Sequence, residues 1–432
     1  MPNLPRTLTV LRNATLPDGR VVDVRLDGDT VSGITEVGPS TSSGTGIGSA
    51  AGTGSGAADH GELDLTGYVL LTAPAEPHAH LDKSQSWDAI NPPMGDLVLA
   101  INSWREYSHG MTVESIADRA RTQALKMLSA GTTAIRTHTD ILHGNDPLRC
   151  VLAIVQVREE LRELMDIEIV ALAGPDVPDA QVEAALDAGV DLVGGAPHLA
   201  GDRSADLQRL LAIAKRRGIG VDMHTDESLD GDHTLSELAV TVRDWDQPVS
   251  AGHCVRLGTL DAETRDAVIA EVKLSDVGII ANPITNLYLQ GWEDPISTPR
   301  GLTPIRELLE AGVRVAAGAD NVRDPFNPLG RSDALETAML LVAAAHLTID
   351  EAYTAVSDTA RSVMSLPVAG VSVGARADLL AVRGSGLPDV VANASADRYV
   401  IHAGNLVAQS FVTSEVATPA LALIPMAPME TR

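Results

Sequence analysis

Six histidines end or directly follow the short apolar segments that the sequence predicts as β-strands. They are His78, His80, His138, His198, His224 and His253. The whole chain has 12 histidines, so half of them gather at strand ends. In a parallel α/β barrel the carboxyl ends of the strands form the face that carries the reactive side chains. The distribution therefore predicts a cluster of imidazoles on one face of such a barrel.

A metal site is the chemistry that these histidines predict. His78 and His80 are two residues apart, and on an extended strand such residues point to the same side. His224 ends the fifth predicted strand and Asp320 follows the eighth. Three imidazoles and one carboxylate suit Zn²⁺ or Fe²⁺ and leave a position for water. We expect one divalent metal ion per chain, bound by His78, His80, His224 and Asp320.

Eight β-type segments alternate with amphipathic helices in the middle of the chain. The predicted strands are residues 69–74, 133–136, 167–172, 192–195, 220–223, 249–252, 277–281 and 314–317. One intervening helix is predicted at residues 113–130, with Thr112 as its N-cap and Gly131 at its end. Eight βα units predict an α/β fold of the closed (β/α)₈ TIM barrel type. An open doubly wound sheet is the alternative, but no Gly-rich phosphate loop follows the first strand.

Both chain ends contain short β-type segments. Residues 21–24 lie between turn-forming pairs, and residues 377–382 and 399–409 are further strand candidates. We expect the ends to combine into a small β-sandwich domain. The predicted parts are residues 1–72 and 366–432 for this domain and 73–365 for the barrel.

Residues 38–58 are almost wholly Gly, Ser, Thr and Ala. Such a composition cannot bury enough apolar surface to offset the entropy of ordering the chain. We predict a flexible surface loop without chemistry. Its replacement by a short turn should shift the melting temperature by only a few degrees.

Composition and charge exclude several classes of partner. The formal net charge is −26, and so acidic a surface repels nucleic-acid phosphates and anionic lipid. No apolar run reaches the ~18 residues of a membrane span, and the N-terminal residues lack the pattern of a secretory signal. The two cysteines are too few for a disulfide framework. We expect a cytoplasmic protein with a small-molecule substrate. The sequence is also compatible with a homo-oligomer.

The motifs at the strand ends resemble those of the amidohydrolase superfamily, and more closely its cytosine deaminase-like branch. The resemblance covers nearly the whole chain. It rests on residues 77–82, 136–140, 195–198, 224–227, 252–253, 281–283, 289–291 and 320–326. Dinuclear members of the superfamily carry a bridging lysine at the fourth strand, and residues 191–197 contain none. The resemblance therefore implies a single metal ion.

The resemblance also implies catalytic roles. A divalent ion lowers the pKa of a bound water, and the hydroxide can attack an sp² carbon bonded to nitrogen. Asp320 would accept the water proton, and His253 would hydrogen-bond the nucleophile or the developing charge. Glu227 would carry a proton to the ring nitrogen and then to the leaving group. His138 and His198 match the family pattern as surrounding or core groups, not as ligands.

Four positions bear on the substrate. Lys83 either pairs with Asp82 or Glu76 or contacts a substrate oxygen, and branch members that act on triazine rings resemble the chain here. Phe326 matches an aromatic that lines the substrate pocket of the branch, although it could equally anchor a loop.

Two departures from the cytosine deaminases concern the same pocket. Gly174 stands where those enzymes present a glutamine that reads the pyrimidine edge, and Asn321 replaces a second aspartate. A pocket that hydrogen-bonds one heterocycle discriminates against ligands that leave its polar groups unpaired. We therefore expect a bulkier, oxygen-rich or anionic aminated heterocycle rather than cytosine.

The preferred function is hydrolytic deamination, or removal of a substituted amine, at a nitrogen heterocycle or a guanidine-like carbon. The same site could instead open a cyclic or linear amide. A catalytically inactive binding protein is a third hypothesis, which the retention of all four ligands together with Glu227 and His253 disfavours. Ammonia release separates the first hypothesis from the second, and any turnover excludes the third.

Overall fold

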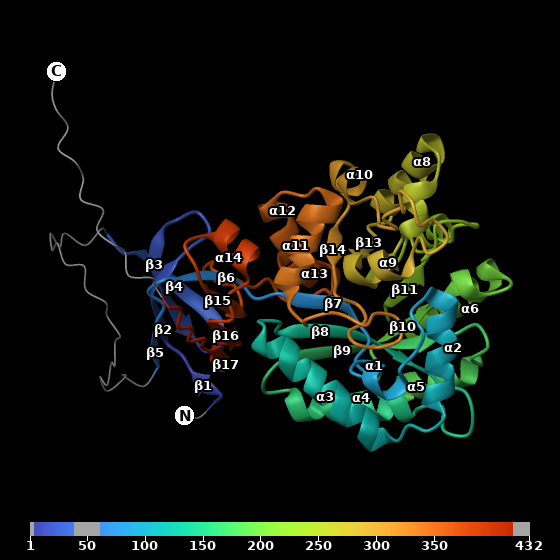
Figure 1. Ribbon diagram of the computed structural model, residues 1–432, viewed down its shortest axis with the longest axis horizontal. Helices are drawn as coiled ribbons and strands as arrows, with labels where there is room; N and C mark the ends of the chain where they lie inside the picture. The colour runs from blue at the N-terminus through green and yellow to red at the C-terminus, as the bar shows by residue number, and fades with distance from the viewer. Residues whose placement is uncertain (1–3, 39–60, 418–432) are drawn as a thin grey trace.

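A computed structural model describes residues 4–38 and 61–417 of the chain (Figure 1). The chain forms a large α/β part and a smaller sheet beside it. Residues 39–58 of the predicted Gly/Ser-rich loop lie outside the described residues, so that prediction stays untested.

The described part of the large domain contains eight parallel strands. In chain order, which is also the spatial order, they are β7 (Ala75–Ala79), β8 (Ala134–Asp140), β9 (Asp166–Ala173), β10 (Leu192–Gly195), β11 (Val221–Thr225), β12 (Val249–His253), β13 (Gly278–Ala281) and β14 (Val315–Ala317). An isolated bridge between Ala79 and Asp320 joins the two ends of the sheet. The predicted (β/α)₈ barrel is confirmed.

The first predicted barrel strand was wrong. The segment predicted at 69–74 is β6 (Tyr68–Thr72), which pairs antiparallel with a C-terminal strand of the small sheet. The barrel starts at β7, three residues later. Both strands are buried along almost their whole length, so hydrophobic periodicity alone does not show where the chain passes from one sheet to the other. In β7 the buried residues Glu76 and His78 are polar, which hides the strand in a hydropathy pattern.

Helices cover the outside of the barrel, as alternation with parallel strands requires. They are α3 (Val113–Ser129), α4 (Arg149–Leu161), α5 (Asp179–Asp187), α6 (Arg203–Arg217), α7 (Leu235–Thr241), α8 (Ala262–Leu274), α10 (Ile305–Glu310), α11 (Ala334–Ala345), α12 (Ile349–Val356) and α13 (Asp358–Val363). In α3 the Thr112 side chain accepts a hydrogen bond from the Ser115 amide, as predicted for its N-cap. Further helices are α1 (Trp87–Ile90), α2 (Leu97–Ser108) and α9 (Pro283–Leu289).

Strands from both chain ends interleave in one nine-stranded sheet of the described residues. The strands not yet named are β1 (Arg6–Thr7), β2 (Val10–Thr15), β3 (Val21–Asp27), β4 (Thr30–Glu36), β5 (Glu62–Asp64), β15 (Leu379–Arg383), β16 (Arg398–His402) and β17 (Asn405–Ser410). C-terminal β15 pairs with β6, and β17 pairs with β1. The sheet has its own hydrophobic core, and α14 (Leu387–Asn393) lies in the β15–β16 connection. The two chain ends therefore fold together, as predicted.

Buried ion pairs join the small domain to the barrel. Asp378, just before β15, pairs with Arg361 of α13, and the two side chains are 0% and 2% exposed. Arg376 also pairs with Asp378, at 3.4 Å, and reaches Asp166 of β9 at 2.8 Å. Asp166, Asp378 and His402 each place one atom that could bind a metal ion within 4.8 Å of the other two. The two arginines neutralise these carboxylates, so we interpret the cluster as an ion-pair network.

We predict that Asp378→Asn lowers the free energy of unfolding by about 3–5 kcal/mol, because it leaves the buried Arg361 cation without its anion. Urea unfolding followed by circular dichroism measures the loss. Glu351→Gln, at the half-exposed pair with Arg306, is the control and should have a much smaller effect. Equal effects of the two substitutions would contradict the buried-pair argument.

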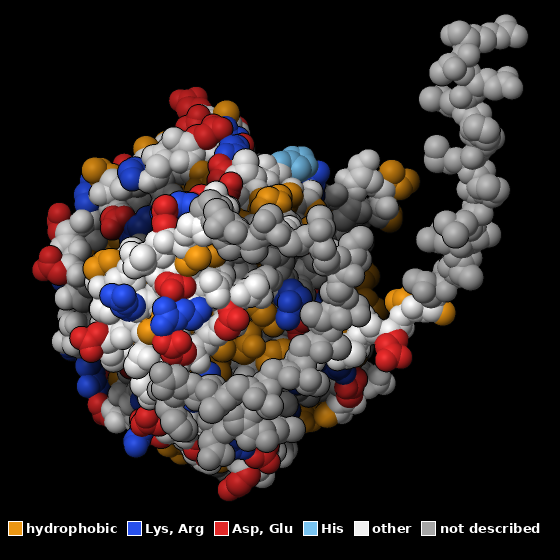
Figure 2. All heavy atoms as spheres, turned by 90° about the vertical axis from the view of Figure 1, so that its left-hand side faces the viewer, with side chains coloured by type: hydrophobic (Ala, Val, Ile, Leu, Met, Phe, Trp, Pro, Cys, Tyr) orange, Lys and Arg blue, Asp and Glu red, His pale blue; other side chains and the backbone are white. Residues whose placement is uncertain are grey.

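Figure 2 shows the small-domain side of the molecule, where acidic and basic side chains are interspersed. Within residues 4–38 and 61–417, no helix is both long and apolar enough to cross a membrane.

Candidate metal centre and active site

The four predicted metal ligands converge at the carboxyl end of the barrel. His224 Nε2 lies 3.2 Å from Nε2 of His78 and 3.2 Å from Nε2 of His80. Asp320 Oδ1 lies 3.2 Å from His80 Nε2 and 3.7 Å from His78 Nε2. Ligands about 2.0–2.2 Å from a tetrahedral zinc ion lie about 3.3–3.6 Å from one another. The spacing of these atoms therefore fits one metal ion.

The electrostatics of the four side chains also fit a cation. Burial, together with nearby imidazoles and cations, lowers the pKa of His78, His80 and His224 well below the usual value. The three rings are therefore neutral near pH 7 and offer lone pairs. Both carboxylate oxygens of Asp320 are buried and have no hydrogen-bond partner among the described residues. A buried carboxylate without partners is costly unless a cation neutralises it.

Local backbone geometry brings these ligands together. Asp320 follows β14 with a positive φ of 59°, and its amide donates to the carbonyl of His78 at 3.0 Å. Gly252 of β12 lies against the His78 ring, and a Cβ there would be 2.7 Å from His78 Cε1. Real Cβ atoms do not approach so closely, so only glycine leaves room for this ligand.

Glu227 and His253 lie beside the ligands, where proton transfer would occur. His253 Nδ1 is 3.4 Å from Glu227 Oε1, and His253 Nε2 is 3.9 Å from Asp320 Oδ2. Burial, and then the charge of Asp320, raise the pKa of Glu227 well above its usual range. Burial lowers the pKa of His253 to about 4. His253 is therefore uncharged near neutral pH, and Glu227 holds a proton more tightly than an exposed glutamate does.

Side chains without a predicted role hold this pair in place. Asn286 and Asn282 amide nitrogens lie 3.1 and 3.4 Å from the two ring nitrogens of His253. Gln290 donates to the backbone carbonyl of Glu227 at 3.2 Å. Asn282 and Gln290 belong to the sequence motifs at residues 281–283 and 289–291, and Asn286 lies between these motifs. The sequence alone assigns none of the three a function.

His138 and His198 surround the ligands, as the family pattern implied. The His138 ring centroid lies 4.1 Å from that of His78 and 4.5 Å from that of His224. Its Nε2 is 3.8 Å from Asp222 Oδ1. His198 Nδ1 lies 3.3 Å from the backbone carbonyl of His224. His198 thus contacts the backbone of a candidate ligand, whereas His138 offers a ring nitrogen close to those of His78 and His224, a second group of atoms that could hold a metal ion.

A cavity of about 550 Å³ opens beside the metal site. Its lining includes His80, Lys83, Gly174, His224, Glu227, His253, Asn321 and Phe326. Cavities of ~300–1,000 Å³ are typical of small-molecule sites. The four predicted substrate-contacting residues therefore share one cavity with Glu227 and His253, whereas the third predicted catalytic residue, Asp320, does not line it.

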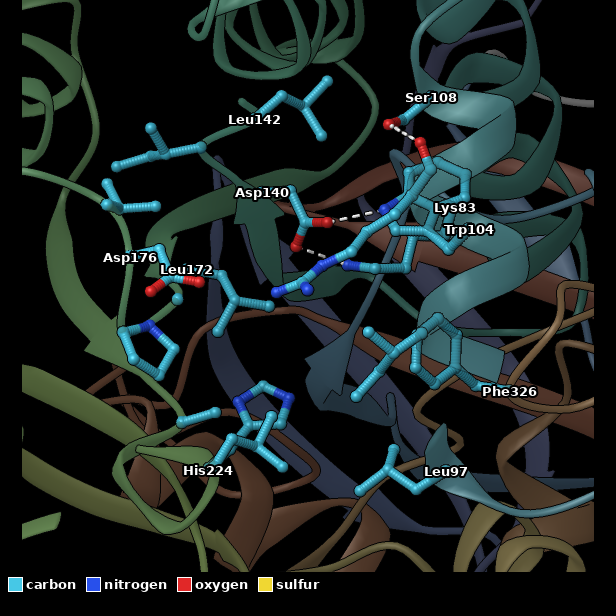
Figure 3. Close-up of a pocket in the computed structure, with 18 of the residues that line it drawn as sticks. Lys83, Leu97, Trp104, Ser108, Asp140, Leu142, Leu172, Asp176, His224 and Phe326 are labelled. Atoms are coloured by element: carbon cyan, nitrogen blue, oxygen red, sulfur yellow. Dashed lines mark hydrogen bonds and ion pairs between the residues drawn. The ribbon is translucent and has the colours of Figure 1, made fainter. Parts of the chain in front are cut away.

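Lys83 pairs with a residue that the sequence did not indicate. Its Nζ lies 2.7 Å from Asp140 Oδ1, and Asp82 is more distant at 3.8 Å. Trp104 of α2 donates to the other oxygen of Asp140 at 2.6 Å, and Figure 3 shows both side chains directed at that carboxylate. Burial lowers the pKa of Lys83, but the charges of Asp140 and Asp82 outweigh this effect and raise it above the usual value. Lys83 is therefore a charged group in the cavity wall.

The other three predicted substrate positions lie as follows. Phe326 is 9% exposed and faces Lys83, whose Nζ is 6.0 Å from the ring centroid. The Asn321 amide nitrogen donates to Asp324 at 2.7 Å, so one of its two N–H donors is already engaged. A Cβ at Gly174 would meet no heavy atom within 4 Å. The cavity therefore has open space where the cytosine deaminases place glutamine.

Comparison with known proteins identifies the class. The Amidohydrolase family profile matches residues 114–408, more than half of the chain. The chain belongs to the amidohydrolase family.

Particular relatives have deaminase or related activities. Pterin deaminase of Rhizobium rhizogenes is 29% identical over 415 residues, which cover 93% of this chain and 94% of that protein. The crystal structure of 5-methylcytosine deaminase from Klebsiella pneumoniae with 5-fluorocytosine matches with a TM-score of 0.83 and 26% identity, covering 95% of this chain and 99% of that one. N-isopropylammelide isopropylaminohydrolase from Burkholderia multivorans matches with a TM-score of 0.76 and 28% identity, covering 93% and 98%. The predicted resemblance to the cytosine deaminase-like branch is confirmed.

Proposed function

We propose that this protein is a metal-dependent hydrolase that deaminates an aminated nitrogen heterocycle. The observation that carries the proposal is the convergence of four candidate ligand atoms, beside a cavity lined by His80, His224, Glu227 and His253. His78, His80, His224 and Asp320 would hold one Zn²⁺ or Fe²⁺. The deaminase relatives support the reaction class.

The reaction replaces an amino group by oxygen: water adds to the ring carbon, and the C–N bond breaks to release ammonia. The bound ion would supply positive charge that makes water a better nucleophile at neutral pH. Asp320 Oδ2, which has no hydrogen-bond partner among the described residues, would accept the proton released by the attacking water.

Glu227 then moves protons on the substrate side. Because its pKa is raised, it would start protonated and donate that proton to the ring nitrogen. It would then take the hydroxyl proton of the adduct as the carbonyl forms, pass it to the leaving amine, and be reprotonated by the proton that Asp320 accepted. The neutral His253 would hydrogen-bond the oxygen as charge develops on it. The two water protons thus replace those gained by the ring nitrogen and the ammonia, and Asp320 and Glu227 return to their starting states.

For the substrate we propose a fused two-ring heterocycle with an amino group and a ring carbonyl, the class to which pterins belong. The open space at Gly174 allows a second ring. An ammonium group has three donors, and Lys83 donates one of them to Asp140 at 2.7 Å. A remaining donor would bind a substrate oxygen, and the neighbouring Phe326 would stack on the ring.

Gly174→Gln should narrow the cavity on the side where a second ring would lie. Its Cβ meets nothing, so the fold should tolerate the change while the longer side chain enters the cavity. We expect kcat/KM for a two-ring substrate to fall by about tenfold or more, with a smaller loss for a one-ring substrate. Steady-state kinetics on pterin and 5-methylcytosine measure both values. An equal loss on the two substrates would contradict the assignment of Gly174 to substrate size.

The proposal is tested with purified protein loaded with Zn²⁺ or Fe²⁺. Pterin, 5-methylcytosine, cytosine and N-isopropylammelide are assayed in parallel for released ammonia or amine. We expect fastest release from pterin. New carboxylate without ammonia from cyclic amides would favour amide hydrolysis instead. If cytosine were the best substrate by a wide margin, the proposed substrate class would be wrong.

A further inference from the structure

A buried carboxylate lies at the seam where the barrel closes, outside the set of metal ligands and proton carriers. Glu76 of β7 is 6% exposed. Its Oε1 accepts a hydrogen bond from the backbone amide of His78 at 3.1 Å. Its Oε2 accepts one from the backbone amide of Ala319 at 2.9 Å. One side chain therefore contacts the backbone of a ligand on one side of the seam and the residue before Asp320 on the other.

The seam itself has few other connections. β7 and β14 are the two ends of the eight-stranded sheet of the described residues, and an isolated bridge between Ala79 and Asp320 joins them. Gly318 leaves space for the carboxylate, because a Cβ there would lie 2.4 Å from Glu76 Oε1. The backbone around Glu76 is thus shaped to admit its side chain between the strands.

We propose that Glu76 is a positioning residue that sets the distance between the His78 and His80 ligands and the Asp320 ligand. This inference rests on the proposed metal site, to which Glu76 contributes no ligand atom. Two of the ligands belong to one end of the sheet and the third to the other end. Their 3.2–3.7 Å spacing depends on how the seam closes. Each oxygen of the Glu76 carboxyl group accepts a hydrogen bond from one amide, so this side chain satisfies both amides at once.

Glu76→Gln tests the proposal because the amide has nearly the same size but only one acceptor oxygen. Its NH₂ group would face a backbone N–H that then has no acceptor. Loss of a group that orients metal ligands typically weakens metal affinity about 10–100-fold. We expect a loss of this size for Zn²⁺, measured by competition of the apoprotein with a chromophoric chelator. Co²⁺-loaded protein should also show altered visible absorption bands, which report ligand geometry.

Two variants make the result decisive. Gly318→Ala keeps the Glu76 carboxyl group but displaces it, and should also weaken Zn²⁺ binding. This variant still tests the proposal if Glu76→Gln does not fold. Asp378→Asn is the control, because Asp378 is a buried carboxylate that joins Arg361 to the Ala403 amide away from the metal ligands. It should lower stability and leave Zn²⁺ affinity unchanged.

The possible failures are distinguishable. If the wild-type protein binds neither Zn²⁺ nor Fe²⁺, both the proposed function and this inference are overturned. If the wild type binds Zn²⁺ tightly and Glu76→Gln and Gly318→Ala bind it equally well, only the role of Glu76 is overturned. The same holds if Asp378→Asn weakens binding as much as Glu76→Gln, because the loss would then follow from general destabilisation.

Discussion

Glu227→Gln should keep its metal and lose about 10²–10⁴-fold in kcat. The amide is nearly isosteric with the acid but cannot transfer the proton that the ring nitrogen and the leaving amine require. Glu227 supplies no ligand atom in the proposed site, and its carboxyl lies 3.4 Å from the His253 ring. The metal content should therefore equal that of the wild type.

Steady-state ammonia release and elemental analysis of the same sample measure both quantities for Glu227→Gln. Glu237→Gln is a matched control, because Glu237 lies on helix α7 and contacts Ser204 and Gln208 away from the cavity. It should keep the wild-type rate. If Glu227→Gln also kept a near wild-type rate on the best substrate, another group would have to carry the proton.

Gly252→Ala should abolish tight metal binding although every ligand is retained. The new Cβ would lie 2.7 Å from Cε1 and 2.8 Å from Nδ1 of His78. The His78 ring is 0% exposed and packs against the rings of His138 and His224, so it cannot turn away. Either the ring or strand β12 must shift, and the ligand geometry is lost.

Zn²⁺ titration of the apoprotein checks this prediction. We expect the affinity for Zn²⁺ to fall by more than about 100-fold, which exceeds the usual effect of changing a group that only orients ligands. A His78→Ala, His80→Ala double variant should show a comparable loss. Gly174→Ala is the control, because its Cβ meets no atom within 4 Å, and it should bind Zn²⁺ as the wild type does. Full metal occupancy in Gly252→Ala or in the double variant would remove His78 from the ligand set.

Much of the ligand set could be predicted because its signals are local. His224 is the last residue but one of β11, His253 is the last residue of β12, and Asp320 follows β14. Counting the βα units was therefore enough to place them on one face. The pair His78 and His80 was recognised by its spacing, even though the strand that carries it was predicted too early. In that case the ligand type was more informative than the hydropathy of the strand.

The contacts around Lys83 could not be predicted, since they depend on tertiary packing. Asp140 lies at the end of β8, and Trp104 lies on α2, a helix inserted before the regular barrel helix. Only barrel closure and the packing of α2 bring them to Lys83. The sequence indicates Glu76 only as a possible partner of Lys83. Its hydrogen bonds from two backbone amides leave no pattern in the sequence.

Titration of metal-free protein with Zn²⁺ or Fe²⁺, with ammonia release from pterin measured at each step, tests whether the protein is a metal-dependent deaminase. We expect no release without metal, a rise with each addition, and saturation at about one equivalent per chain. Full activity in the chelated protein would contradict a metal-dependent reaction, and saturation near two equivalents would contradict the single site. Release of no ammonia at any metal ratio, from pterin or from the other aminated heterocycles, would contradict deamination itself.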